Sequence, residues 1–131
     1  MFEQRSKCAP SLIAYNNKIM LHQMKLRPGP FKKIVGGQKI IESRLFDEKR
    51  QKIRVGDKIE FTSNDNSDKK VTTKVVALFL FKSFDDLFSE LDPQLFGGSS
   101  KDALLNEIEQ FYSPAEQEKY GVVGIKIQVD K

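Results

Sequence analysis

The sequence predicts an α+β domain in which an antiparallel sheet curls around a hydrophobic core. The chain has 131 residues, a length that suits a single domain. Apolar and polar residues alternate through several short stretches, and this period of two is that of a half-buried β-strand. Helix-capping signatures then follow one another late in the chain, so helices are expected just before a final strand.

The first predicted elements lie in the N-terminal third of the chain. Residues 1–17 show neither helical nor strand periodicity and are predicted to form a tail or arm, which leaves 18–131 as the domain. Apolar residues occupy both faces of 19–26, so this stretch is expected to be a mostly buried strand. The sequence Arg-Pro-Gly-Pro ends it, and 31–35 is predicted as a short helical turn.

The next predicted strand, 39–46, carries the most conspicuous pair of charges. Glu42 and Arg44 are two positions apart, which places both side chains on the same face of a strand. Their charges can therefore pair with each other or share a ligand. A charged connection, 47–53, follows this strand.

Two more strands are predicted in the middle of the chain. The first is 58–62, and the polar run 64–68 is expected to be the loop that follows it. The long stretch 70–81 should then return antiparallel to its predecessor. Its odd-numbered residues, from Val71 to Phe81, are expected to share one face.

Three helices are predicted from one capping signature. A serine side chain accepts a hydrogen bond from the backbone, and an acidic residue three positions later returns it. The second helix has an apolar stripe that we expect to pack on the sheet. A closing strand, 122–129, is expected to have one dry face. The capping pairs are Ser83 with Asp86, Ser99 with Asp102 and Ser113 with Glu116, and the stripe is Leu104, Leu105, Ile108 and Phe111.

Positive charge is concentrated in one part of the chain. The net charge is +4, yet residues 25–58 contain 11 basic and 4 acidic residues, a balance of +7, which leaves −3 for the rest of the chain. Such a block can attract phosphate, because neutralising a nucleic-acid backbone releases its counterions. From charge alone, a solvated face with no ligand is the alternative.

Several other kinds of protein and site are not supported by the sequence. The longest apolar run, 75–81, is far shorter than the roughly 20 residues of a membrane helix, and no secretory signal is evident. The single cysteine, Cys8, agrees with a reducing compartment, so we expect a cytoplasmic protein, with a monomer favoured. His22 is the only histidine and is expected to be structural, so neither a metal site nor a cofactor is predicted.

One octapeptide resembles a family motif. Residues 37–44 read GQKIIESR, which is similar to the GxKxxExR motif of the ASCH domain, named for activating signal cointegrator homology and related to the PUA fold. The segment 45–50 resembles the bacterial branch of this family, and 83–88 is similar to the segment that follows its long strand. The resemblance covers about 18–129.

The resemblance implies a PUA-like fold, which is a partly open, mainly antiparallel β-barrel with peripheral helices and a cleft beside the motif. It also implies binding of RNA, or of a nucleotide or nucleoside, in RNA metabolism or translation. Lys39 offers phosphate a mobile charge, Arg44 offers a planar donor fork, and Glu42 can accept from a base or ribose. Further basic residues are expected to extend this surface: Lys49, Arg50 and Lys52.

Two alternatives remain open at the motif. Lys39, Glu42 and Arg44 can instead form a structural ion-pair network without a ligand. Some proteins of this family are enzymes, including an acetylcytidine amidohydrolase and ribonuclease-like proteins, which would make this chain a small hydrolase with Lys39 and Glu42 as catalytic residues. A carboxylate can act as a general base or nucleophile, but the amidohydrolase has a threonine at the position matching Glu42.

Overall fold

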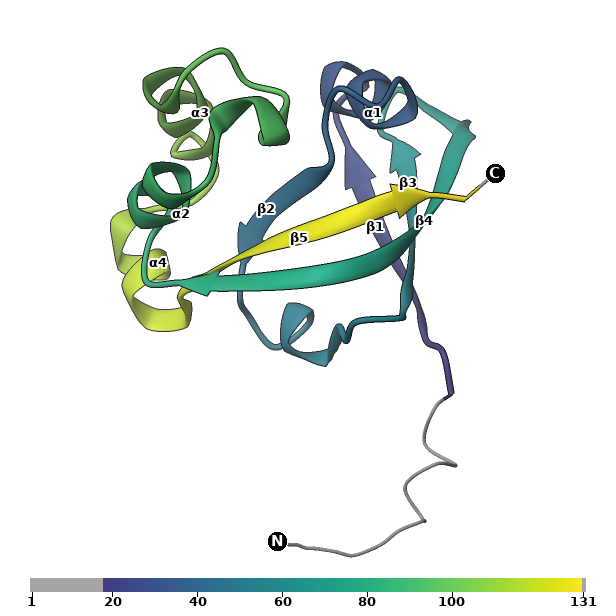
Figure 1. Ribbon diagram of the computed structural model, residues 1–131, viewed down its shortest axis with the longest axis horizontal. Helices are drawn as coiled ribbons and strands as arrows, with labels where there is room; N and C mark the ends of the chain where they lie inside the picture. Colours follow the sequence, from purple (N-terminus) through teal and green to yellow (C-terminus); the bar gives the residue numbers. More distant parts are fainter. Residues whose placement is uncertain (1–17, 131) are drawn as a thin grey trace, which may run out of the picture.

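In the computed structural model, which describes residues 18–130, a curled five-stranded sheet carries helices on its outer side and at one end (Figure 1). The strands are β1 (Leu21–Leu26), β2 (Ile41–Leu45), β3 (Lys58–Ser63), β4 (Asn66–Phe81) and β5 (Val122–Val129). The helices are α1 (Pro28–Val35), α2 (Phe84–Glu90), α3 (Lys101–Ile108) and α4 (Pro114–Tyr120), with 3-10 turns η2 (Arg50–Lys52) and η3 (Pro93–Phe96).

The strand order makes the sheet a half-open barrel. It runs β1-β3-β4-β5-β2, so β1 and β2 are the two edges and do not pair with each other. Only β1 and β3 are parallel, and the other neighbouring strands are antiparallel. The predicted α+β class and mainly antiparallel barrel are therefore confirmed. The tail predicted for residues 1–17, with Cys8, lies outside the described residues.

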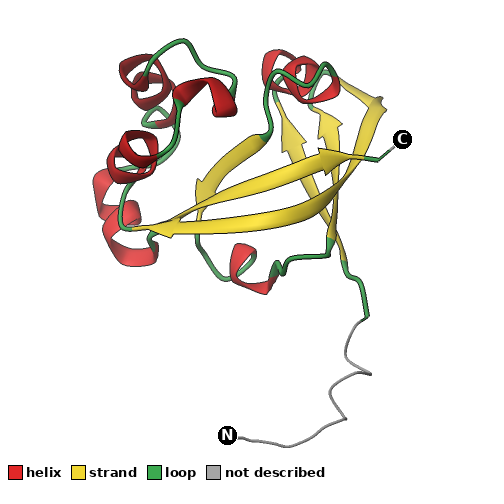
Figure 2. Ribbon diagram, in the orientation of Figure 1, coloured by secondary structure: helices red, strands yellow, loops and turns green. Residues whose placement is uncertain are grey.

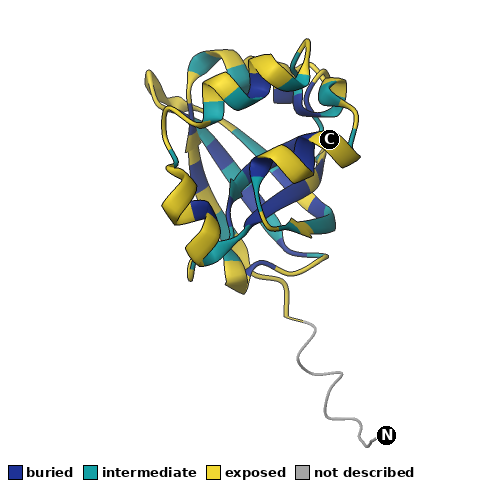
Figure 3. Cartoon of the chain, turned by 90° about the vertical axis from the view of Figure 1, so that its left-hand side faces the viewer, coloured by how far each residue is buried: buried dark blue, intermediate teal, exposed yellow. Residues whose placement is uncertain are grey.

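Each face of the sheet covers its own hydrophobic core. The first core fills the inside of the curl and is closed by α1, while the second lies beneath α2, η3 and α3 at the other end of the molecule (Figure 2). Figure 3 shows the buried strand segments in dark blue and the exposed helix faces in yellow. The first core includes Met24, Phe31, Ile34, Ile59, Phe61, Val75, Val123 and Ile125, and the second includes Ile41, Leu45, Phe84, Leu87, Phe88, Phe96 and Val122.

A bulge in β4 changes which side chains of this strand face each core. The pairing of β4 with β5 shifts between Val75 and Ala77, so one extra residue enters β4 there. Before the bulge Val71 packs against the first core, and after it Leu78 does so, while Phe79 packs against the second core. The predicted single face of this strand is therefore wrong, because the extra residue reverses which side chains point inward.

The first strand also differs from its prediction. Leu21 is 55% exposed, and within β1 only Met24 and Leu26 are buried. Within residues 18–130, β1 is an edge strand that pairs with β3 alone, and its face with Leu21, Gln23 and Lys25 is exposed. The expectation of a mostly buried strand is therefore wrong.

Several boundaries move for local reasons. α1 begins at Pro28, because a proline in the first turn of a helix needs no hydrogen-bond donor. The polar run after β3 is a tight turn, and β4 begins at Asn66. β2 begins at Ile41, which leaves Lys39 in the segment that approaches the strand.

The predicted capping serine is confirmed at two of three positions, and the returning hydrogen bond is present at one of these two. The side chain of Ser83 accepts from the backbone of Asp86, and Ser113 forms a reciprocal capping box with Glu116. The middle helix is capped by Ser100 instead of the predicted Ser99. α3 ends before Phe111, which is exposed and does not continue the apolar stripe as expected.

Candidate functional site

A pocket of about 640 Å³ lies between the barrel and the helices, next to the open seam between β1 and β2. One wall comes from the end of β1, from α1 and from β2, and the other comes from η3, α3 and the residues after α3. The charged side chains that line it are mostly basic: Lys25, Arg27, Lys33, Lys39 and Arg44, with the acidic Glu42 and Glu107.

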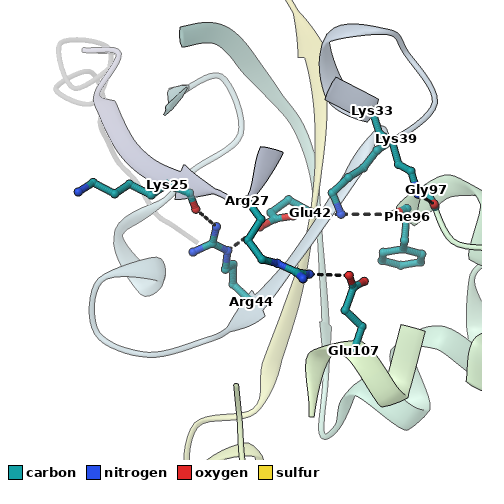
Figure 4. A network of polar contacts seen from close by, with 9 residues as sticks. All are labelled: Lys25, Arg27, Lys33, Lys39, Glu42, Arg44, Phe96, Gly97 and Glu107. Carbon is teal, nitrogen blue, oxygen red and sulfur yellow. Dashed lines mark hydrogen bonds and ion pairs between the residues drawn. The ribbon is translucent and has the colours of Figure 1, made fainter. Parts of the chain in front are cut away.

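Glu42 lies between two cations at the buried end of this pocket (Figure 4). Its Oε1 is 3.1 Å from Nζ of Lys39, and its Oε2 accepts a hydrogen bond of 2.6 Å from Nε of Arg44. The Glu42 side chain is only 7% exposed. A buried carboxylate costs much solvation energy, and here each of its oxygens is compensated by a cation.

Backbone carbonyls hold the two cations in place. Nζ of Lys39 donates to the carbonyl of Phe96 over 3.2 Å, which connects the segment before β2 to η3. Nη2 of Arg44 donates to the carbonyl of Lys25 over 2.9 Å (Figure 4). Because Lys25 belongs to β1 and Arg44 to β2, this hydrogen bond crosses the open seam of the barrel.

The local sequence explains how the three charges meet. Glu42 pairs with Ile125 in the β2–β5 register and Arg44 pairs with Val123, so both charges point into the curl beside core residues. Lys39 reaches the same place from outside the strand, because its backbone N–H donates to the carbonyl of Lys33 at the end of α1.

Glu42 and Arg44 hold each other in their charged forms. Burial is the largest influence on the Glu42 pKa and raises it, but the charges and hydrogen bonds of Lys39 and Arg44 together outweigh burial and lower it to about 2. Burial likewise lowers the pKa of Arg44, whereas the Glu42 carboxylate raises it, and the net change is upward. By formal charge, the cluster Lys39–Glu42–Arg44 carries one net positive charge.

The other three predicted binding residues do not line the pocket. Lys49, Arg50 and Lys52 lie in and beside η2, beyond the far end of β2 from Lys39. Nη1 of Arg50 pairs with Oδ2 of Asp47 at 2.9 Å, so this side chain also stabilises its own turn. Their role in ligand binding stays a prediction.

Several residues of the pocket were not singled out from the sequence. Lys33 donates to the carbonyl of Gly97 over 2.8 Å, and Arg27 pairs with Glu107. Arg27 and Lys33 belong to the basic block 25–58, and membership of this block was the one feature of the sequence that pointed to them. Glu107 gave no signal, and Phe111 was expected to pack on the sheet, because their contacts with Arg27 join segments far apart in the chain.

His22 has the structural environment expected for it. Its Nε2 lies 2.8 Å from Oδ2 of the buried Asp57, which also accepts from the backbone of Met20 and Arg54. Within residues 18–130, no group of three histidine, cysteine or acidic side chains is placed to hold a metal ion. Over the same range, no helix has the length and apolar character needed to cross a membrane.

The curled sheet, its peripheral helices and the pocket beside the motif together define a PUA-like domain. The ASCH domain profile matches residues 24–130, and the chain therefore belongs to the ASCH domain family. The family suggested by the octapeptide is confirmed, and domains of this family generally bind nucleic acids. No curated protein matches the sequence significantly.

Solved structures support the same assignment. Hypothetical protein PH0355 is 31% identical, with a TM-score of 0.76 over 85% of this chain and 100% of its own. Protein PF0455 from Pyrococcus furiosus is 29% identical, with a TM-score of 0.67 over 84% of this chain and 97% of its own. A mutant form of ZmASCH from Zymomonas mobilis shares the fold at 15% identity, with a TM-score of 0.53 over 82% of this chain and 67% of its own.

Proposed function

We propose that this protein binds RNA by holding a nucleotide unit in the pocket beside Lys39, Glu42 and Arg44. The observation that carries the proposal is the set of five cationic side chains around a cavity of about 640 Å³. That volume lies within the roughly 300–1,000 Å³ typical of small-ligand sites. A duplex is too large for such a cavity, whereas the base, ribose and phosphate of a single strand can be accommodated.

In this proposal Glu42 positions the two cations that face the ligand. Both of its oxygens are engaged, one with Lys39 and one with Arg44, so it keeps these long side chains in fixed places before a ligand arrives. Cations that are fixed beforehand lose less conformational freedom on binding. The cluster still carries a positive charge, which favours a phosphate.

The same geometry gives less support to a hydrolase. A general base works best when its pKa is near the operating pH, and the pKa of Glu42 is about 2. A nucleophilic carboxylate also needs a free oxygen, but both oxygens of Glu42 are held by cations. We therefore favour RNA binding over turnover of a modified nucleoside.

The test replaces one pocket cation outside the buried cluster. Lys33 is exposed and lines the pocket, whereas Lys74 is exposed on β4 and does not line it. Lys33→Gln and Lys74→Gln therefore remove the same charge from different places. The affinity of each variant is measured by fluorescence anisotropy with a labelled octa-adenylate RNA at low salt.

Lys33→Gln is expected to weaken binding roughly three- to tenfold, as for the loss of one charged contact, whereas Lys74→Gln should change it less than twofold. Equal effects of the two substitutions would show that the RNA responds to net charge and not to the pocket. Absence of any RNA binding by the wild-type protein would overturn the proposed function.

A further inference from the structure

The rim of the pocket carries an ion pair above an aromatic ring. Nη2 of Arg27 lies 2.5 Å from Oε2 of Glu107, and the guanidinium carbon of Arg27 lies 5.2 Å from the centre of the Phe111 ring. The Arg27 and Glu107 side chains are 45% and 50% exposed, in contrast to the buried Glu42 below them. The pocket therefore has a buried charged floor and an exposed rim.

Phe111 is unusual among the aromatic residues of this chain. Of all the phenylalanine and tyrosine residues within 18–130, it alone is exposed, with 55% of its surface accessible. It lies outside any helix or strand, just after α3, and it belongs to neither hydrophobic core. Packing of the fold therefore does not account for an aromatic residue at this position.

We propose that an unpaired base of the bound nucleotide stacks on the Phe111 ring. Until the ligand binds, the ring is covered by Arg27, which is held there by its ion pair with Glu107; we call this ion pair the clasp. The inference rests on the proposed function and specifies which part of the ligand occupies the rim. Unpaired bases stack on aromatic rings and on guanidinium planes, both of which this rim presents. The phosphate then lies toward the cations of the floor.

The energetics allow the base to replace the clasp. An exposed ion pair contributes little to stability, because water screens the charges and two long side chains must be held still. Stacking of a base on an aromatic ring is the stronger interaction. Release of Arg27 from the ring also frees a cation beside the incoming phosphate, so little favourable interaction is lost on opening.

The clasp joins the two walls of the pocket. Arg27 immediately precedes α1, whereas Glu107 lies in the last turn of α3, 80 residues further along the chain. Figure 4 shows the pair in front of Glu42, between the barrel side and the helical side. A ligand that reaches the floor by this route has to pass the clasp, so the ion pair is expected to slow association.

The first experiment separates stacking from phosphate binding. Phe111→Leu and Phe111→Tyr are compared with the wild-type protein for two probes, labelled octa-adenylate RNA and inorganic polyphosphate of matched charge. Phe111→Leu should weaken RNA binding about tenfold, the loss expected for one stacked base, and leave polyphosphate binding within twofold. Phe111→Tyr should retain RNA affinity, because it keeps the ring. Thermal unfolding verifies that each variant is folded.

The second experiment opens the clasp. Glu107→Gln removes the partner of Arg27, and Glu109→Gln removes the same charge from an exposed residue nearby that does not line the pocket. Stopped-flow association with octa-adenylate should be several-fold faster for Glu107→Gln than for Glu109→Gln. Equal rates would contradict the clasp.

The outcomes keep the two proposals apart. If wild-type protein binds RNA in a manner that depends on Lys33 but Phe111→Leu binds it equally well, the stacking platform is wrong and the proposed function stands. If Phe111→Leu weakens RNA and polyphosphate to the same extent, the ring shapes the pocket and does not stack a base, which also overturns the inference. If wild-type protein binds no RNA, both proposals fail.

Discussion

Glu42 is a buried carboxylate that pairs with two cations at the pocket. Its two oxygens join Lys39, which comes from the segment after α1, to Arg44, which reaches across the seam to β1. The sequence left two interpretations of these residues open, a ligand clamp and a structural ion-pair network. The structure contains the ion-pair network and places it in the lining of the pocket, so the network leaves ligand binding there a prediction. Truncation of either cation should therefore destabilise the fold as well as the site.

The lowered pKa of Glu42 predicts a specific loss of stability in acid. Its folded-state pKa is about 2 against an ordinary value of 4.5, so its stabilising effect is complete above pH 4.5 and is lost as the pH falls through 2. Wild-type protein should be more stable than Glu42→Gln at pH 7, and roughly 2–3 kcal/mol of that difference should be lost by pH 2.5.

Urea unfolding of both proteins at pH 7, 4 and 2.5 measures this difference. Glu109→Gln is the matched control, because Glu109 is exposed, and its difference from wild type should stay small at every pH. A gap between wild type and Glu42→Gln that is the same at pH 7 and pH 2.5 would show that Glu42 is not held in its charged form by its neighbours.

At the scale of elements, β2 and the turn after it separate the basic residues into two groups. Lys39 precedes β2 and Arg44 lies within it, and both line the pocket, whereas Lys49 and Lys52 lie in or beside η2 after the strand and do not line it. A ligand confined to the pocket touches only the first group. A longer RNA that leaves the pocket along the surface can also meet the second group.

Replacement of Lys49 and Lys52 together by glutamine distinguishes these two cases. Arg50 is retained, because it pairs with Asp47 within the turn. We expect the double variant to bind adenosine monophosphate as the wild-type protein does and to bind a 15-nucleotide RNA several-fold more weakly. Isothermal titration with both ligands provides the comparison. Unchanged binding of the longer RNA would remove Lys49 and Lys52 from the interface.

For the molecule as a whole, the position of the charges determines the electrostatic field at the pocket more than the net charge does. The chain has a net charge of only +4, but within residues 18–130 the basic block 25–58 supplies every cation that lines the pocket. The opposite wall of the pocket is formed by η3 and α3, which are distant from the basic block in the sequence and contribute few charges. The result is an excess of positive charge on one side of the cavity, an arrangement that favours polyanionic ligands in general.

The logarithm of the binding constant for octa-adenylate should therefore decrease linearly with the logarithm of the salt concentration. The slope should be about −0.7 for each phosphate neutralised on a single strand. Lys33→Gln should make this slope shallower by about one contact, while Lys74→Gln should leave it unchanged. Titrations between 50 and 300 mM salt measure both slopes, and a wild-type affinity that ignores salt would argue against phosphate contacts in the pocket.

The sequence alone determined the features that depend on short-range pattern. Alternation indicated the closing strand, which the structure has at Val122–Val129, and the capping chemistry identified the starts of α2 and α4. The two-residue spacing of Glu42 and Arg44 placed their charges on one strand face, and the octapeptide around them identified the family. Each of these features depends on residues within a few positions of one another, so the linear pattern is enough to detect it.

Only the tertiary structure decided the features that depend on distant neighbours. The edge position of β1 left Leu21 exposed, and the bulge in β4 reversed the face that alternation had assigned to its second half. The rim of the pocket depends on Arg27 and Glu107, which are 80 residues apart. Burial and contact at these places are set by which elements the fold brings together. That information is not contained in the period of any one segment.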